Sequence, residues 1–293
     1  MHRAGFVNVI GNPNVGKSSL INELVGDRIS IVTSKSQTTR HRILGIVNEE
    51  DFQIIYSDTP GVLIPKYGLQ VSMLQFSRSA LTDADVLIYV TDVFDQLDKN
   101  IDFINAINQN PAPLIVIINK IDLIDQHKLE MLVENCKNIF PRAEILPVSV
   151  LHKFNIEPLK KRIKELLPES PPYFDKDQLT DKPERFFVGE IIREKILLHY
   201  EKEIPYSVEV EIEKFTETEK IIHISAIIYV ERDSQKGILI GQGGKALKRV
   251  GIEARKDIEA FFSKKVFLQL FVKVEKDWRN KEKKLKDFGY QIE

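Results

Sequence analysis

The sequence contains a single cysteine, Cys136, among its 293 residues. One cysteine excludes a framework of intramolecular disulfides and any metal site built from several cysteines. The six histidines are scattered along the chain and show no metal-ligand spacing. Cys136 lies in an amphipathic stretch, residues 128–140, so we expect it to be a small core residue.

Long apolar runs are also lacking, and none approaches the 18 residues that a membrane-spanning helix requires. A glycine-rich loop follows Met1-His2-Arg3 so closely that we expect no signal peptide, and hence a cytoplasmic protein. The 42 Lys and Arg residues nearly balance the 43 Asp and Glu residues, so net charge indicates no class of partner. The hydrophobic fraction, 43%, is ordinary for a globular chain of one or two domains.

The stretch G-N-P-N-V-G-K-S follows an apolar run, Ala4–Ile10, and precedes a helical pattern, Lys17–Leu24. This strand–loop–helix context is typical of a phosphate-binding loop. Glycines let the backbone approach a ligand, and the N–H groups and the helix start favour an anion. We expect Lys17 to reach the β- and γ-phosphates and the Ser18 hydroxyl to ligate Mg²⁺. The predicted nucleotide-binding residues of this loop are Gly11, Asn12, Pro13, Asn14, Val15, Gly16, Lys17, Ser18 and Ser19.

Strand and helix patterns alternate through the first half of the chain. Strands are expected at residues 4–10, 42–48, 53–58, 86–91, 114–119 and 144–148, and helices at residues 17–24, 69–81, 99–108, 127–140 and 156–166. Alternation of this kind predicts an α/β fold with a doubly wound, mostly parallel sheet. Ligands of such sheets bind beyond the carboxyl ends of the strands, so the loops there are the candidate site.

The loop Asp58-Thr59-Pro60-Gly61 ends the third predicted strand. A carboxylate at Asp58 can hold Mg²⁺ through water, and the Gly61 N–H can reach a γ-phosphate. Such a turn is common on its own, but its place one strand beyond a phosphate loop makes it a strong indication of a nucleotide site.

Asn119-Lys120-Ile121-Asp122 ends the fifth predicted strand and is the predicted base-reading loop. Asp122 can accept from N1–H and the 2-amino group of guanine, whereas adenine would leave the carboxylate unpaired. That mismatch can discriminate by roughly 10⁴, which argues against an ATPase. We expect Asn119 to join this loop to the phosphate loop and the Lys120 stem to cover the base. Ser149 and Val150, after the sixth strand, fit the last purine-contacting loop.

These motifs resemble the translation-factor-related class of P-loop GTPases across residues 1–170. The resemblance implies binding of GTP and GDP, a requirement for Mg²⁺, and slow hydrolysis that partners regulate. It also implies a switch segment, here Ile31–Arg40, that supplies a Mg²⁺-binding threonine. Thr39 aligns best with that threonine, and Thr38 is the alternative. The expected Mg²⁺ ligands are therefore Ser18, Thr39 and Asp58.

Val62 stands where Ras-like enzymes carry the glutamine that orients the attacking water. A valine can neither donate to water nor accept from it, so no catalytic side chain is assigned, and Lys17, Thr39 and Gly61 are expected to assist. We expect turnover near the roughly 10⁻⁴–10⁻² s⁻¹ of unassisted GTPases. Related enzymes with a hydrophobic residue here often carry a K⁺-coordinating asparagine. Asn14 is the matching position, and K⁺ activation is a hypothesis.

Three prolines, Pro168, Pro171 and Pro172, interrupt helix and strand patterns and indicate a stiff connector. We therefore predict a nucleotide domain at residues 1–170, a linker at 171–184 and a second domain at 185–293. In the second domain, helices are expected at residues 185–200, 245–262 and 278–288, and strands at 206–215, 220–231 and 266–275.

The loop Gly241-Gln242-Gly243-Gly244 joins two helices and keeps its backbone bare, so a sugar–phosphate backbone can lie against it. Clamps of the G-x-x-G type hold about four nucleotides in KH modules, and the α-β-β-α-α-β order corresponds to the type II KH arrangement, a smaller α+β domain. Residues 234–286 carry a net charge of +9, against −5 for residues 190–219, which favours a one-sided nucleic-acid surface. The predicted RNA-binding residues are Ile238, Ile240, Gly241, Gln242, Gly243, Gly244, Lys245, Lys248 and Arg249.

A GTPase domain followed by a type II KH domain resembles the Era family across nearly the whole chain. Other matches to that family are Q-T-T-R-H-R at residues 37–42 and Phe288-Gly289-Tyr290. The resemblance implies a factor for assembly of the small (30S) ribosomal subunit that binds single-stranded 16S rRNA near its 3′ end. It also implies peripheral association with the inner face of the cell membrane, and we expect a monomer. The residues alone support a GTP switch coupled to single-stranded RNA binding. The alternative is an RNA-binding chaperone in which nucleotide is mainly structural.

Overall fold

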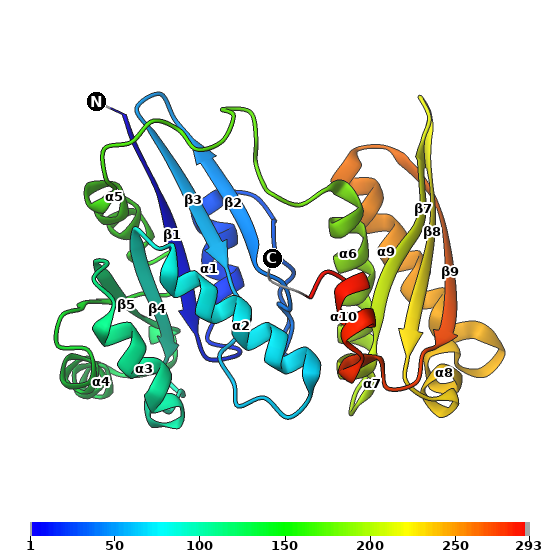
Figure 1. Cartoon of the computed structure of the whole chain (residues 1–293), viewed down its shortest axis with the longest axis horizontal. Helices are drawn as coiled ribbons and strands as arrows, with labels where there is room; N and C mark the ends of the chain where they lie inside the picture. Colours follow the sequence, from blue (N-terminus) through cyan, green and yellow to red (C-terminus); the bar gives the residue numbers. More distant parts are fainter. Residues whose placement is uncertain (1, 291–293) are drawn as a thin grey trace.

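The computed structural model describes residues 2–290, which form two units side by side along the longest axis (Figure 1). The N-terminal unit is built on a six-stranded sheet and the C-terminal unit on a three-stranded sheet. No helix in this described range is both long and apolar enough to cross a membrane.

The six-stranded sheet has the order β2-β3-β1-β4-β5-β6, and only β2 runs antiparallel to its neighbour. Every residue of β3, β4 and β5 is buried, as expected for strands that are covered on both faces. The predicted doubly wound, mostly parallel sheet is therefore confirmed. The strands are β1 (Arg3–Gly11), β2 (Ile43–Asn48), β3 (Phe52–Asp58), β4 (Val86–Asp92), β5 (Leu114–Asn119) and β6 (Glu144–Pro147).

Two apolar clusters, one on each face, fix the helices to this sheet. Helices α1 (Lys17–Val25) and α5 (Ile156–Leu166) pack on one face. Helices α2 (Gly68–Thr82), α3 (Ile101–Gln109) and α4 (Gln126–Ile139) cover the other, where Cys136 is buried as predicted. Short 3₁₀ turns, η1 (Leu97–Asn100) and η2 (Ile121–Leu123), follow β4 and β5.

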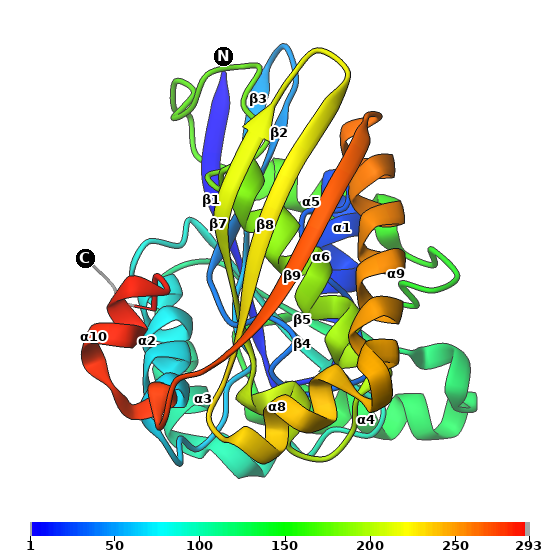
Figure 2. The same cartoon turned by 90° about the vertical axis from the view of Figure 1, so that its right-hand side faces the viewer.

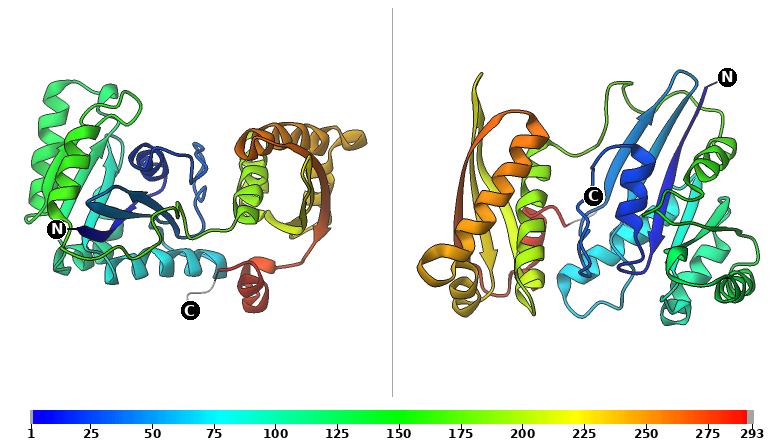
Figure 3. Two further views of the ribbon diagram at one scale, coloured as in Figure 1. Left: turned by 90° about the horizontal axis from the view of Figure 1, so that it is seen from above. Right: turned by 180° about the vertical axis from the view of Figure 1, so that it is seen from behind.

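Apart from a short helix after α6 and the elements that follow β9, the C-terminal unit has the order α-β-β-α-α-β of a type II KH domain. Its sheet, β7-β8-β9, pairs β7 antiparallel and β9 parallel to β8. One face of the sheet packs on α6 and α9, so the strands form the outermost layer of the molecule (Figures 2 and 3). The elements are α6 (Glu184–His199), β7 (Glu209–Glu217), β8 (Ile221–Val230), α8 (Asp233–Ile240), η3 (Gln242–Gly244), α9 (Lys245–Phe262) and β9 (Lys265–Val274).

In this unit one predicted strand begins later than expected, and one predicted helix is wrong. The strand expected from Tyr206 is preceded by a short helix, α7 (Ile204–Ser207), because Pro205 suits the first turn of a helix. The single helix expected at residues 278–288 is a 3₁₀ turn, η4 (Trp278–Asn280), and a separate helix, α10 (Glu282–Asp287). Trp278 is fully buried and its indole N–H donates to the Ser207 carbonyl at 3.0 Å, which fixes the turn against α7.

The connector between the two units lies along the outer edge of the six-stranded sheet. The Ile46 N–H of β2 donates to the Leu179 carbonyl at 2.8 Å, and the Leu44 N–H donates to Asp181 Oδ1 at 2.8 Å. Gln53, which is fully buried in β3, accepts from the backbone N–H of Phe174 at 3.0 Å. The connector is therefore fastened to the N-terminal unit as far as Asp181.

Candidate nucleotide site and nucleic-acid interface

The predicted phosphate loop connects β1 to α1, and the predicted base-reading loop is bound to it. Asn119 at the end of β5 donates from Nδ2 to the Val15 carbonyl at 2.9 Å. Gly16 has a φ of 98°, and a Cβ there would lie 2.3 Å from Asn119 Nδ2. Gly16 is therefore required both for its backbone conformation and for the close approach of Asn119.

Lys17 is buried in the loop, and its Nζ donates to the Asn12 carbonyl at 2.8 Å. Burial lowers the pKa of Lys17 to about 8, although Asp58 and Asp95 both oppose that shift. An ammonium so deprived of solvent is strongly stabilised by a nearby anion, as a nucleotide phosphate would be.

Ser18, Thr39 and Asp58 converge from α1, the switch segment and the end of β3. Ser18 Oγ donates to Asp58 Oδ2 at 2.7 Å and lies 2.8 Å from Thr39 Oγ1. Asp58 Oδ1 is buried and, within residues 2–290, has no hydrogen-bond partner. Burial raises the pKa of Asp58, against the effect of the Ser18 hydrogen bond and of Lys17. Two hydroxyls and an unpartnered carboxylate oxygen are the hard ligands that Mg²⁺ prefers, so these residues fit that ion.

The geometry favours Thr39 over Thr38 as the switch threonine. Thr39 Oγ1 lies 3.3 Å from Asp58 Oδ2, whereas the Thr38 hydroxyl donates to the Lys35 carbonyl at 2.6 Å. Thr38 therefore caps a turn within the switch and does not face the Asp58 carboxylate.

The base-reading residues come together at the ends of β5 and β6. Asp122 Oδ1 accepts from Ser149 Oγ at 2.6 Å, which orients the carboxylate. The Val150 N–H donates to Asn119 Oδ1 at 3.2 Å. Lys120 donates from Nζ to the Asn14 carbonyl at 2.7 Å, so its stem extends across the space between the two loops.

The loop after β3 lies against the phosphate loop. The Val62 N–H donates to the Gly11 carbonyl at 3.1 Å, and Thr59 Oγ1 donates to the Val9 carbonyl at 2.8 Å. The Val62 side chain is buried in the core beneath α2 and offers no polar atom to a water. A Cβ at Gly61 would lie 2.7 Å from the Pro13 nitrogen, so the predicted Gly61 packs closely against the phosphate loop, while the carbonyl of the predicted Pro60 accepts from the Ser77 hydroxyl of α2 at 2.8 Å. A cavity of about 390 Å³ opens between this loop, the phosphate loop and the switch.

Sequence reasoning missed Asp95, which positions Asn12. Asn12 Nδ2 donates to Asp95 Oδ1 at 2.9 Å, and Asn12 Oδ1 accepts from Asn100 at 2.8 Å. A signal was present, because Asp95 follows β4 at the same edge of the sheet as the other site residues.

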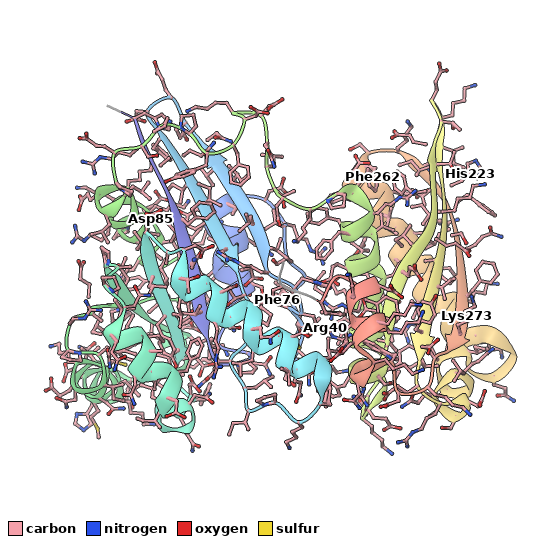
Figure 4. All side chains as sticks on the ribbon, viewed as in Figure 1. Arg40, Phe76, Asp85, His223, Phe262 and Lys273 are labelled. Carbon is pink, nitrogen blue, oxygen red and sulfur yellow. The ribbon has the colours of Figure 1, made fainter. Side chains whose placement is uncertain are left out.

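The switch segment is bound to the C-terminal unit by buried charged groups that sequence reasoning also missed. The Arg40 side chain, labelled between the two units in Figure 4, is fully buried and donates to the Val208 carbonyl at 2.7 Å. Its Nη1 also lies 3.1 Å from Glu209 Oε2. Arg193 of α6 donates to the Thr38 carbonyl. The two neighbours of Thr39 in the chain, Thr38 and Arg40, are therefore both hydrogen-bonded to the C-terminal unit.

The start of α2 and the residue that follows the switch segment contact the C-terminal end of the chain. The Gly68 N–H at the start of α2 donates to Asn280 Oδ1 at 2.9 Å. The imidazole of His41 stacks on Tyr290 with 4.2 Å between ring centroids, and the Tyr290 hydroxyl donates to Glu209 at 2.6 Å. Burial lowers the pKa of His41 to about 3, so this imidazole is neutral. Both segments beside the phosphate loop therefore touch the C-terminal unit.

A groove of about 360 Å³ lies between α9 and β9. The adjoining Gly243 and Gly244 have φ values of 58° and 76°, and a Cβ at either would meet open space. Of the predicted RNA-binding residues, Gly244 and Lys248 line this groove, whereas the half-exposed Ile238 and the neighbouring Ile240 on α8 do not. The groove is lined by Gly244, Leu247, Lys248, Gly251, Ile252, Arg255, Leu268 and Leu270.

Comparison with known proteins identifies both units. Residues 6–120 match the family described as 50S ribosome-binding GTPase, and residues 203–279 match the KH domain family. A crystal structure of Era in complex with MgGDPNP and nucleotides 1506–1542 of 16S ribosomal RNA is 36% identical, with a TM-score of 0.95 over 100% of both chains. A variant of Aquifex aeolicus Era bound to GDP and AlF4⁻ is also 36% identical, with a TM-score of 0.94 over 99% of this chain and 100% of that chain.

The chain belongs to the Era family. The similarity to Era extends over both units, which we call the GTPase domain and the KH domain from here on. The GTPase assignment agrees with the phosphate loop, the Ser18–Thr39–Asp58 cluster and the Asn119–Asp122 loop.

Proposed function

We propose that this protein is a GTP-hydrolysing switch that binds single-stranded 16S rRNA near its 3′ end and assists assembly of the small ribosomal subunit. The proposal is supported by a similar Era that was crystallised with MgGDPNP and nucleotides 1506–1542 of 16S rRNA, and by another that was crystallised with GDP and AlF4⁻. Residues 1–170 act as the GTPase domain and residues 185–293 as the RNA-binding domain, with 171–184 as the linker.

Coupling between nucleotide binding and RNA binding is supported by the hydrogen bonds that join the switch segment to the KH domain. Thr39 faces Asp58 and Ser18, while the adjacent Arg40 donates to Val208 and pairs with Glu209. Ordering of Thr39 on a bound Mg²⁺ and γ-phosphate therefore acts directly on the position of β7. The alternative, a chaperone in which nucleotide is only structural, gives no reason for a buried arginine to join the switch to the RNA-binding unit.

Within the GTPase domain, Ser18, Thr39 and Asp58 hold Mg²⁺, which neutralises charge on the β- and γ-phosphates when it is bound. Lys17 contributes a further positive charge at the phosphates. Asp122, oriented by Ser149, reads guanine, and Lys120 covers the base. Because Val62 is buried and apolar, hydrolysis is slow and depends on backbone groups or on a partner.

A role for K⁺ at Asn14 extends the proposal. Asn14 has a φ of 66°, lines the nucleotide cavity and donates from Nδ2 to the Ser34 carbonyl of the switch at 3.0 Å. Equal hydrolysis rates in Na⁺ and K⁺ buffers would refute this role. We further propose that the protein is a cytoplasmic monomer that acts on the 30S subunit and associates peripherally with the inner face of the membrane.

The decisive experiment measures the affinity of the full chain for single-stranded RNA with GDPNP, with GDP and without nucleotide. Affinity that depends on the nucleotide supports the switch, and equal affinities favour the chaperone. Gly243→Asp provides the control, because aspartate tolerates the φ of 58° at this open position and adds a negative charge to the loop. This variant should lose RNA binding while it keeps its GTP hydrolysis rate.

A further inference from the structure

The outer face of the KH sheet carries a row of alternating charged, aromatic and polar side chains that the proposed groove does not use. On β9, the residues that point away from the helices are Lys265, Phe267, Gln269, Phe271 and Lys273, and all five are exposed. Their neighbours, such as Leu268 and Leu270, point toward α9. Figure 2 shows the three strands in front of the helices on this side.

Two large aromatic side chains on this row, Phe267 and Phe271, are about half exposed. Phe267 is 48% exposed and Phe271 is 51% exposed. Four residues along a strand span about 13 Å, so the rings are separated by roughly the length of two extended nucleotides. His223 of β8 lies beside Phe267, with 5.7 Å between ring centroids, and widens the aromatic surface.

Lysines lie at both ends of the aromatic row. Among the side chains that the structure describes, Lys273 has no ion-pair partner within 4.0 Å, and Lys265 has only Glu259, at 3.8 Å. Figure 4 shows Lys273 and His223 on the side of the KH domain that faces away from the GTPase domain. The row thus combines flat apolar rings with cations, which is the combination that binds single-stranded nucleic acid without reading its sequence.

The row is continuous with the groove described above. Leu268 and Leu270 line that groove from the same strand, and β9 is an edge strand of the sheet. A polynucleotide that leaves the groove has only to pass over the edge of β9 to reach Phe267 and Phe271. The acidic Glu211 and Glu213 lie on β7, two strands away, and so confine a polyanion to the β9 side.

We propose that the Lys265–Lys273 row of β9 is a second contact surface for single-stranded RNA, on which bases stack on Phe267 and Phe271. This inference rests on the proposed binding of RNA in the groove between α9 and β9. The surface extends the length of RNA that the KH domain holds beyond the roughly four nucleotides of a G-x-x-G clamp.

The test compares two RNAs on the full chain loaded with GDPNP: four nucleotides from the 3′ end of 16S rRNA, and twelve nucleotides with that tract in the centre. Phe267→Ala combined with Phe271→Ala should weaken binding of the longer RNA about tenfold or more, since loss of one stacked base alone has an effect of that order. Binding of the four-nucleotide RNA should not change. Equal affinity of the double variant and the wild type for the longer RNA would overturn the proposal.

Three further variants separate stacking from other effects. Phe271→Trp should keep the affinity for the longer RNA, whereas Phe271→Leu should weaken it. Equal affinity of these two variants for the longer RNA would exclude stacking. Met131→Ala, which removes a side chain that is 62% exposed on α4, should change neither affinity. If the groove between α9 and β9 does not bind RNA, the result is different, because the wild type itself should then show no affinity for either RNA.

Discussion

Arg40 of the switch segment and Glu209 at the start of β7 form a buried ion pair across the two domains, with 3.1 Å between Nη1 and Oε2. Glu209 also accepts from the Tyr290 hydroxyl at 2.6 Å, so the switch, the KH sheet and the end of the described chain meet at one carboxylate. Burial raises the pKa of Glu209, and Arg40 opposes this shift.

Replacing Arg40 by alanine should therefore destabilise the docking of the two domains. Removal of one partner of a buried pair leaves the other charge uncompensated and typically costs about 3–5 kcal/mol. We expect Arg40→Ala to lower the midpoint of urea unfolding and to make RNA affinity independent of nucleotide. Arg162→Ala, which removes exposed ion pairs with Glu144 and Glu165 at the surface of the GTPase domain, should leave the midpoint of urea unfolding almost unchanged and the nucleotide dependence intact.

The affinity for GTP should fall as the pH rises above 8. Burial lowers the pKa of Lys17 to about 8 in the free protein, and phosphate oxygens raise it in the complex. Below pH 8 the ammonium is already present, so its contribution to binding is complete. Above pH 8 binding must take up a proton, which calorimetry in buffers of different ionisation enthalpy measures. Affinity that is constant between pH 7 and pH 9.5 would contradict the assigned environment of Lys17.

Asp122→Asn should change the preferred base from guanine to xanthine. The amide at this position can donate to the 2-oxo group of xanthine, whereas it no longer accepts from the 2-amino group of guanine. We expect a loss of roughly 10³-fold or more in GTP affinity and a gain in XTP affinity, measured by competition. Ser149→Ala should weaken GTP binding less, because it removes only the group that orients the carboxylate. A variant that still prefers GTP would show that Asp122 does not read the base.

Gly16→Ala should abolish nucleotide binding. The new Cβ would lie 2.3 Å from Asn119 Nδ2 at a φ of 98°, so both the phosphate loop and the base-reading loop must shift. Gly237→Ala is the matched control, because a Cβ there meets open space in the middle of α8. That variant should bind GTP normally and gain about 0.5–1 kcal/mol of stability, as is typical of glycine replaced within a helix. Wild-type GTP affinity in Gly16→Ala would refute the close approach of Asn119.

Thr39→Ala should reduce hydrolysis and the affinity for Mg²⁺ more than Thr38→Ala does. Thr39 Oγ1 lies 2.8 Å from Ser18 Oγ, whereas Thr38 bonds within its own turn. Single-turnover hydrolysis across a Mg²⁺ titration distinguishes the two variants. A larger effect of Thr38→Ala would transfer the assignment to that residue.

Most of the nucleotide site could be predicted from the sequence because its chemistry is local. The phosphate loop, Asp58 and Asn119–Asp122 each follow a buried strand, and parallel strands bring their carboxyl ends to one edge. Arg40, Arg193 and Tyr290 could not be assigned, because their partners lie on the other domain and no periodic pattern marks an interdomain contact. The sequence predicts Leu268 and Leu270 only as part of a strand, because their place in the groove depends on how α9 packs beside β9.

The attachment of the connector to β2 restricts how the two domains can move. The chain is held to the GTPase domain as far as Asp181, and α6 begins at Glu184, which leaves Lys182 and Pro183 between them. Two residues span at most about 7 Å, and proline fixes one of the backbone angles. If loss of the γ-phosphate frees Thr39 and the interdomain contacts open, this short connection limits the KH domain to rotation about Lys182 and Pro183 and keeps it beside the GTPase domain.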